Sequence, residues 1–191
     1  MISTFTAVID ANVFYGARLR SLILSLAQTG LFRAHWSNDI HEEWISNLLN
    51  NRPDLQRSDL EKTRQLMDGA VLDCLVFDYE ELIPSLTLPD ENDRHVLAAA
   101  IRGRANVIVT FNMKDFPDDA LMRHGMHSRH PDDFLLDLFG VDEEACMDAV
   151  QEDIAHYKEP PLTVEDYLTS LEKAGVPNTA AYLRQRQIIF E

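Results

Sequence analysis

The chain of 191 residues contains very little cysteine and few glycines. Two cysteines, Cys74 and Cys146, are too few for a disulfide framework or a cysteine-based zinc site, and their scarcity fits a reducing cytoplasm. The seven glycines include no Gly-rich loop of the kind that holds phosphates, since Gly16 and Gly30 stand alone. The disulfide-stapled and phosphate-loop classes are therefore excluded, and we expect a cytoplasmic protein.

Long apolar runs are also missing. No segment approaches the ~18 consecutive apolar residues of a membrane span, and we expect no membrane partner. The N-terminus lacks the basic segment and apolar core of a signal peptide. Hydrophobic residues make up 46% and charged residues 26%, which is ordinary for a soluble globular protein. The length suffices for one sizeable core, or for one domain with an appendage.

Positive charge is scarce and unevenly placed. The chain has 17 Lys and Arg residues against 32 Asp and Glu residues, a net charge of −15. Residues 1–130 carry 18 acids and 13 bases, whereas residues 131–191 carry 14 acids and 4 bases. This balance argues against broad, nonspecific adhesion to nucleic acid, but an enzyme that grips a few phosphates locally is still allowed. A basic protein partner is favoured, because complementary charge speeds association.

What the sequence does contain is an alternation of strand and helix patterns. Residues 6–9 and 106–110 are short runs rich in β-branched residues, typical of buried strands, and residues 31–36 form a plausible third strand. Helical patterns lie between them, over residues 21–28, after a cap at residues 37–39, after a capping box formed by Ser58 and Glu61, and from Asp90 or Asn92 to about Gly103. This order predicts an α/β fold with a mostly parallel sheet and helices on both faces.

The pattern changes at about residue 130. Beyond it the strand signals disappear and acid-rich helical segments follow, over residues 132–139, 142–157, 164–174 and 178–187. We therefore predict an α/β domain over residues 1–130 and a helical C-terminal extension over residues 131–191.

Acidic residues stand at the ends of the predicted elements. Asp10 and Asp115 follow buried strands, Asp93 lies in the first turn of a helix, and Glu43 lies on a helix that follows a strand. Any one of them is most simply explained as a helix cap or a solvated side chain. Ligands of open α/β sheets bind outside the carboxyl ends of the strands, where these acids would meet. Converging carboxylates repel each other unless a cation is present, and Mg²⁺ and Mn²⁺ prefer such oxygen ligands.

The ordered set of motifs resembles the PIN domain over roughly residues 5 to 130, and most closely the VapC-type ribonucleases of bacterial toxin–antitoxin pairs. The residues that carry the resemblance are the strand with Asp10-Ala11-Asn12, Ser37-x5-Glu43, Asp90-x2-Asp93-Arg94-His95-x-Leu97-x2-Ala100 and Val109-Thr110-x-Asn112-x2-Asp115-Phe116. The resemblance implies a Rossmann-like α/β/α sandwich and Mg²⁺- or Mn²⁺-dependent cleavage of RNA. The segment after His130 resembles the helical extension of one subgroup of these toxins.

The resemblance also implies an acidic quartet. The first three acids fall on Asp10, Glu43 and Asp93. Many members place the fourth two residues after the threonine, where this chain has Asn112. Asp115 can supply the charge instead, and Asn112 can still bind a metal-bound water through its side-chain carbonyl. We therefore expect Asp10, Glu43, Asp93 and Asp115 to be catalytic and metal-binding, with Asn112 as a further metal ligand.

Other residues near the motifs are expected to support the site. Three of them, Asn12, Asp90 and Thr110, would hold the carboxylates in place. Three basic residues, Arg18, Arg20 and Lys114, would contact RNA phosphate, although solvated surface or pairing within the chain is the ordinary role of such residues. Trp36 and Trp44 lie on apolar stripes, so core packing is favoured over base stacking for both.

Three functions are compatible with the sequence. The favoured one is a metal-dependent endoribonuclease acting as the toxin of a toxin–antitoxin pair, with RNA as substrate, a basic antitoxin as partner and a homodimer as the assembly. A housekeeping RNA-processing nuclease with the same chemistry is the nearer alternative. A non-catalytic PIN-like binding module is the other, and only Asn112 favours it. The spaced histidines His124, His127 and His130 are not favoured as metal ligands, because Gly125 and Pro131 interrupt the helix that would align them.

Overall fold

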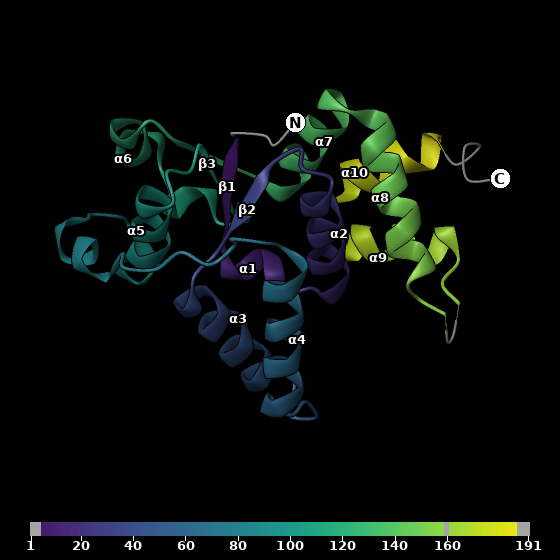
Figure 1. Ribbon diagram of the computed structural model, residues 1–191, viewed down its shortest axis with the longest axis horizontal. Helices are drawn as coiled ribbons and strands as arrows, with labels where there is room; N and C mark the ends of the chain where they lie inside the picture. The colour runs from purple at the N-terminus through teal and green to yellow at the C-terminus, as the bar shows by residue number, and fades with distance from the viewer. Residues whose placement is uncertain (1–4, 159–160, 187–191) are drawn as a thin grey trace.

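Among the residues that the structure describes, 5–158 and 161–186, four strands form one parallel sheet in the order β2-β1-β3-β4. This computed structural model is shown in Figure 1. The strands are β1 (Thr6–Ile9), β2 (Arg33–His35), β3 (Val107–Val109) and β4 (His127–Arg129). Every neighbouring pair runs parallel, so the carboxyl ends of all of them lie at one edge of the sheet. The predicted parallel sheet is confirmed.

The two central strands are the ones that the sequence predicts most clearly. All residues of β1 and β3 are buried, because both faces of a central parallel strand are covered by helices. The outer strand β4 has no clear signal in the sequence, since it is short and polar and buries only Ser128. The hydroxyl of Ser128 donates to the backbone oxygen of Phe116, which satisfies the buried group.

The helices begin and end close to the predicted positions, with two exceptions. Their bounds are α1 (Ala11–Phe14), α2 (Ala17–Gln28), α3 (Asn38–Asn51), α4 (Arg57–Ala70), α5 (Arg94–Arg102), α6 (Asp118–Leu121), α7 (Pro131–Val141), α8 (Glu143–Ala155), α9 (Val164–Lys173) and α10 (Pro177–Gln185). Short 3₁₀ helices are η1 (Glu80–Ser85), η2 (Glu91–Asp93), η3 (Met113–Asp115) and η4 (Met122–His124). Helix α2 starts at Ala17, four residues before the predicted start.

The second exception is the capping box. Ser58 does not cap α4, which begins at Arg57 after Gln56 and has no side-chain cap. The carboxylate of Glu61 instead lies near Arg57 and Arg64 on the same exposed helix, where these charges attract it. The predicted cap Ser37 is confirmed, and its hydroxyl accepts from the backbone N–H of Ile40 at the start of α3.

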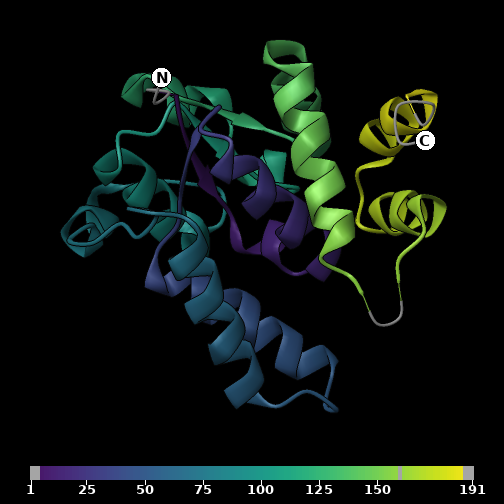
Figure 2. The ribbon, with the colours of Figure 1, turned by 45° about the vertical axis from the view of Figure 1, so that its right-hand side comes forward.

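Helices cover both faces of the sheet, as the α/β sandwich predicts. Helix α5 packs against β1 and β3 on one side, and α2 lies on the other side (Figure 1). Helix α8 lies beside α2 and forms an outer layer, which Figure 2 shows from a second direction. Helices α3 and α4 pack on each other and project below the sheet (Figure 1). The fold is therefore an α/β sandwich with a helical C-terminal region.

The C-terminal helices share the core with the sheet. Phe134 of α7 packs edge-on against Phe32, which precedes β2, with 5.1 Å between the ring centres. The four predicted helices of this region are confirmed as α7 to α10, although Gln187, the predicted end of the last, lies outside the described residues. The division into domains at residue 130 stays a prediction. Trp36 and Trp44 are fully buried, as predicted.

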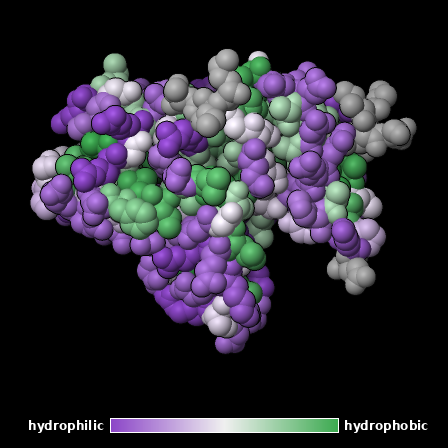
Figure 3. All heavy atoms as spheres, viewed as in Figure 1, coloured by the Kyte–Doolittle hydropathy of each residue, from purple (hydrophilic) through white to green (hydrophobic). Residues whose placement is uncertain are grey.

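The visible surface is mostly polar where the C-terminal helices lie. Figure 3 shows hydrophilic residues over α8 and over most of the α3 and α4 projection. Within residues 5–158 and 161–186, no helix combines the length and the apolar character that crossing a membrane requires.

Candidate active site

Asp10 stands at the carboxyl end of the central strand β1 and caps helix α1. Its Oδ1 accepts from the backbone N–H of Ala11 at 2.7 Å, and its Oδ2 accepts from the side chains of Asn12 at 2.6 Å and Thr110 at 2.7 Å. Only 3% of Asp10 is exposed. Burial raises the pKa of Asp10 from 3.8 to about 6, although the hydrogen bond from Thr110 acts in the opposite direction. Three hydrogen bonds therefore fix the orientation of the carboxylate, while its burial disfavours the negatively charged form.

Thr110 and Asn12 join the ends of β1 and β3. The Thr110 hydroxyl donates to Asp10 and accepts from the Asn12 amide at 2.9 Å and from the backbone N–H of Asn112 at 2.9 Å. A hydroxyl has one donor and two acceptor positions, so its capacity is fully used. Asn12 Oδ1 accepts in turn from the backbone N–H of Phe111 at 3.1 Å. These two residues fix Asp10 relative to the loop after β3.

Glu43 reaches the same edge of the sheet from α3. Its Oε2 lies 3.2 Å from His95 Nε2, at the start of α5. Burial disfavours the charged form of His95, but the hydrogen bond and charge of Glu43 outweigh it, so that the pKa of His95 is raised. The contact with His95 therefore holds Glu43 in position. The sequence motif includes His95, but its role follows only from this contact between two distant helices.

Asp93 lies in η2, just before α5, and is the most strongly perturbed acid of the site. Its pKa is raised from 3.8 to about 7, first by burial and then by repulsion from Asp10, Asp90, Glu43 and Asp115. Its Oδ2 is buried and has no hydrogen-bond partner among the described residues. Asp90 caps η2, accepting from the backbone N–H of Asn92 at 2.9 Å.

The loop after β3 contains both candidates for the fourth position, Asn112 and Asp115. The side-chain amide of Asn112 donates to Asp115 Oδ2, so the two candidates for the fourth position are in direct contact. Asp115 acts on Asp93 by charge, which places it in the same cluster. Lys114 lies between them in sequence and is exposed.

The cluster has the character of a cation site. Several carboxylates act on one buried, unpartnered oxygen of Asp93, and the charged form of Asp93 is disfavoured without a counter-charge. Oxygen donors of this kind fit a hard divalent cation. In the part of the chain that the structure describes, no three His, Cys, Asp or Glu side chains are arranged as a ready ligand group. The electrostatics, and not a closed ligand cage, are therefore what favours this cluster as the candidate site.

Arg18 and Arg20, two of the predicted RNA contacts, are engaged elsewhere. Arg18 donates from Nε to the hydroxyl of Ser170 at 3.0 Å, and its guanidinium lies 3.9 Å from the centre of the Tyr157 ring. Arg20 donates to the backbone oxygen of Phe14 and lies over Trp44. Burial lowers the pKa of Arg20. These contacts within the chain count against a phosphate-binding role for either arginine, whereas Lys114 is exposed.

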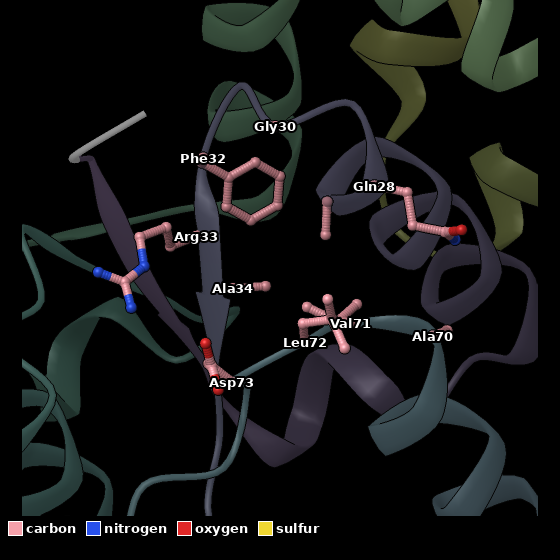
Figure 4. Close-up of a pocket in the computed structure, with 10 residues that line it drawn as sticks. Gln28, Gly30, Phe32, Arg33, Ala34, Ala70, Val71, Leu72 and Asp73 are labelled. Atoms are coloured by element: carbon pink, nitrogen blue, oxygen red, sulfur yellow. The ribbon is translucent and has the colours of Figure 1, made fainter. Parts of the chain in front are cut away.

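One surface hollow lies elsewhere, and none of the residues of the acidic cluster lines it. A hollow of about 660 Å³ lies beside β2 and the end of α4, lined by Phe32 and Ala34 on one side and Val71 and Leu72 on the other (Figure 4). Among the described residues that line it, Asp73 is the one acid, and Gln28 and Arg33 are also polar. The hollow holds no group of carboxylates, so it is a weaker candidate for phosphate chemistry than the carboxyl edge of the sheet.

Comparison with known proteins agrees with this geometry. Residues 6–114 match the family described as "PIN domain", and residues 131–185 match the one described as "VapC50 C-terminal domain". A protein of Mycobacterium tuberculosis named "Putative ribonuclease VapC50" is 45% identical over 109 residues, which are 57% of this chain and 63% of that protein. The match thus spans less than two thirds of the relative. No solved structure gives a significant match. Because the first match covers more than half of the sequence, this chain belongs to the PIN domain family.

Proposed function

We propose that this chain is a metal-dependent endoribonuclease that hydrolyses RNA phosphodiester bonds and acts as the toxin of a type II toxin–antitoxin pair. The observation that carries the proposal is the electrostatic coupling of Asp10, Glu43 and Asp115 to Asp93. The ribonuclease named among its relatives supports the same reaction class.

The ion in this proposal is Mg²⁺ or Mn²⁺. The four acids would hold it, with the carbonyl of Asn112 as a further donor. When bound, a divalent cation stabilises the charge that develops on the phosphate and eases deprotonation of the attacking water. The unpartnered Oδ2 of Asp93 supports this assignment, because nothing among the described residues satisfies it.

The chain's own residues position the reaction. Thr110 and Asn12 fix Asp10, and His95 fixes Glu43, so two of the acids are oriented before any ligand arrives. Water attacks phosphorus in line, the bond to the 3′ oxygen breaks, and this oxygen takes up a proton. The products are a 5′-phosphate and a 3′-hydroxyl. Lys114, exposed beside the cluster, would contact a backbone phosphate of the RNA.

The acidic C-terminal region supports a basic antitoxin as the partner. Residues 131–191 carry 14 acids and 4 bases, and like charge keeps RNA phosphates away from this surface. A basic protein segment would be attracted to it, with an affinity that falls as salt rises.

The first experiment measures cleavage of an RNA by purified protein with and without Mg²⁺ or Mn²⁺. We expect Asp10→Asn, Asp93→Asn and Glu43→Gln to lower the rate by at least on the order of a hundredfold, because each removes a negative ligand. Glu42→Gln is the matched control, since Glu42 is the exposed neighbour of Glu43 and pairs with Arg57. Cleavage by Asp10→Asn at the wild-type rate would reject the assignment.

A second experiment separates a toxin from a processing enzyme. Induced expression should arrest growth of the host cell, and co-expression of the neighbouring reading frame should restore it and yield a salt-sensitive complex. The Asp93→Asn variant should bind this partner without arresting growth. Harmless expression of an active wild-type enzyme would reject the toxin role while leaving the nuclease assignment intact.

A further inference from the structure

Phe111 lies between the residues that orient Asp10 and the candidates for the fourth acid. It follows Thr110 and precedes Asn112, and its backbone N–H donates to Asn12 Oδ1. Asn12 and Thr110 are the two side chains that hold Asp10 Oδ2. A shift of the Phe111 backbone would therefore move both residues that orient the central carboxylate.

The ring of Phe111 is held by residues from beyond β4. The His130 ring meets it edge-on, with 5.1 Å between the ring centres. On another side lies Gly175, in the turn between α9 and α10. A Cβ atom on Gly175 would lie 2.9 Å from Cε1 and 3.2 Å from Cζ of the Phe111 ring. The turn and the ring thus touch so closely that a side chain at residue 175 would displace one of them.

Glycine is required at position 175 for two reasons. Its φ is +90°, in the left-handed region that favours glycine, and the ring of Phe111 occupies the space of a side chain. The preceding Ala174 approaches Gly16, where an added Cβ would lie 3.8 Å from the Ala174 Cβ. Gly16 lies in the short connection between α1 and α2, and Phe111 lies in the connection after β3. One turn of the C-terminal region therefore lies next to both connections.

The turn is itself firmly anchored. Asp132 at the start of α7 is buried and accepts from the backbone N–H groups of Asn178 and Thr179, at 2.9 and 2.7 Å, and from the Thr179 hydroxyl at 2.7 Å. These bonds fix the start of α10. On the other side of the turn, Ser170 of α9 accepts from Arg18. The turn cannot move without breaking buried hydrogen bonds.

We propose that Phe111 is a positioning residue of the active site, and that the Ala174–Gly175 turn of the C-terminal region holds it in place. The helical extension is then a structural part of the catalytic geometry and not only a surface for a partner. This inference rests on the proposed function, because it concerns the same site.

The test is Gly175→Ala with Gly30→Ala as the matched control. Gly30 also has a left-handed φ, +78°, but an added Cβ there would meet nothing within 4 Å. Both variants carry the same kind of backbone strain, and only the first displaces Phe111. We expect Gly175→Ala to lower kcat by on the order of tenfold to a hundredfold with little change in RNA affinity, and Gly30→Ala to leave kcat unchanged.

A second readout needs neither RNA nor metal. The NMR signals of the Asn12 side-chain amide and the Phe111 backbone amide should shift in Gly175→Ala and stay in place in Gly30→Ala. If Gly175→Ala does not fold, Phe111→Leu replaces it, since a smaller side chain leaves the turn without its contact. The same changes in the Asn12 signal are expected.

The outcomes separate the two proposals. If the wild-type protein cleaves no RNA, the proposed function fails, and the NMR signals alone decide whether Phe111 positions Asn12. If the wild type is active and a folded Gly175→Ala protein matches Gly30→Ala in both kcat and the Asn12 signal, the positioning role of Phe111 is overturned.

Discussion

The hydroxyl of Thr110 donates a 2.7 Å hydrogen bond to Asp10 Oδ2, joining residues that are 100 positions apart in the sequence. The same hydroxyl accepts from the Asn12 amide and from the backbone of Asn112. The ends of the two central strands are thereby tied together at the point where the acids meet. Asp10 is consequently oriented by the chain itself before any ligand binds.

Replacing Thr110 with valine should weaken both the fold and the site. The valine has nearly the same shape but leaves two donors and one acceptor without their partner, so we expect a loss of about 1–3 kcal/mol in unfolding free energy. Cleavage should fall by roughly tenfold to a hundredfold, as for other groups that orient metal ligands. Thr110→Ser, which keeps the hydroxyl, should retain most of both. A large loss in Thr110→Ser with little loss in Thr110→Val would show that the methyl group matters and the hydroxyl does not.

Asp93→Asn should stabilise the metal-free protein at alkaline pH. The pKa of Asp93 is raised to about 7 in the folded protein, so its favourable contribution is complete below about pH 4 and is lost as the pH rises through 7. Removing the charge should raise the unfolding free energy at pH 8 by roughly 1–2 kcal/mol, allowing for partial exposure, and by less at pH 5.5.

Denaturant unfolding with a chelator present measures this effect. Added Mg²⁺ or Mn²⁺ should stabilise the wild type and have a much smaller effect on Asp93→Asn. An Asp93→Asn variant that is less stable than the wild type at pH 8 without metal would contradict the conclusion that burial and neighbouring carboxylates disfavour the charge of Asp93.

The fourth ligand can be identified by comparing Asp115→Asn with Asn112→Ala. If Asp115 supplies the charge, Asp115→Asn should lose much of the metal-dependent activity and Asn112→Ala less, because Asn112 then only orients its neighbour through its amide. The opposite order would assign the role to the Asn112 carbonyl. Near-wild-type rates in both variants would mean that Asp10, Glu43 and Asp93 suffice.

Arg18→Ala and Lys114→Ala should have contrasting effects. Arg18 bonds Ser170 and stacks on Tyr157, so its loss should lower the unfolding free energy by about 1–2 kcal/mol without changing the salt dependence of RNA binding. Lys114→Ala should leave stability unchanged and reduce the slope of log affinity against log salt by about 0.7. Both substitutions are made in a catalytically inactive variant, so that the RNA is not cleaved. Filter binding of these proteins to single-stranded RNA at several salt concentrations then provides the slopes. A reduced slope for Arg18→Ala would restore its predicted role in RNA binding.

The sequence by itself determined the features that depend on local patterns. The β-branched runs of β1 and β3 identify the central strands, because these residues suit a strand buried on both faces. The cap at Ser37 and the apolar periodicity of the last four helices likewise depend on neighbours a few residues away. Parallel strands share one edge, so acids that follow them could be predicted to lie near each other from their order alone.

Only the tertiary structure decided which side chains meet. Glu43 contacts His95, Thr110 bonds to Asp10, and Arg18 bonds to Ser170 of the C-terminal region. The outer strand β4 has no clear signal in the sequence for the same reason, since its polar residues form a strand by pairing with β3 and not through their own preference. Such contacts join residues separated by tens of positions, and the packing of whole helices and strands selects them. No local preference in the sequence encodes that choice.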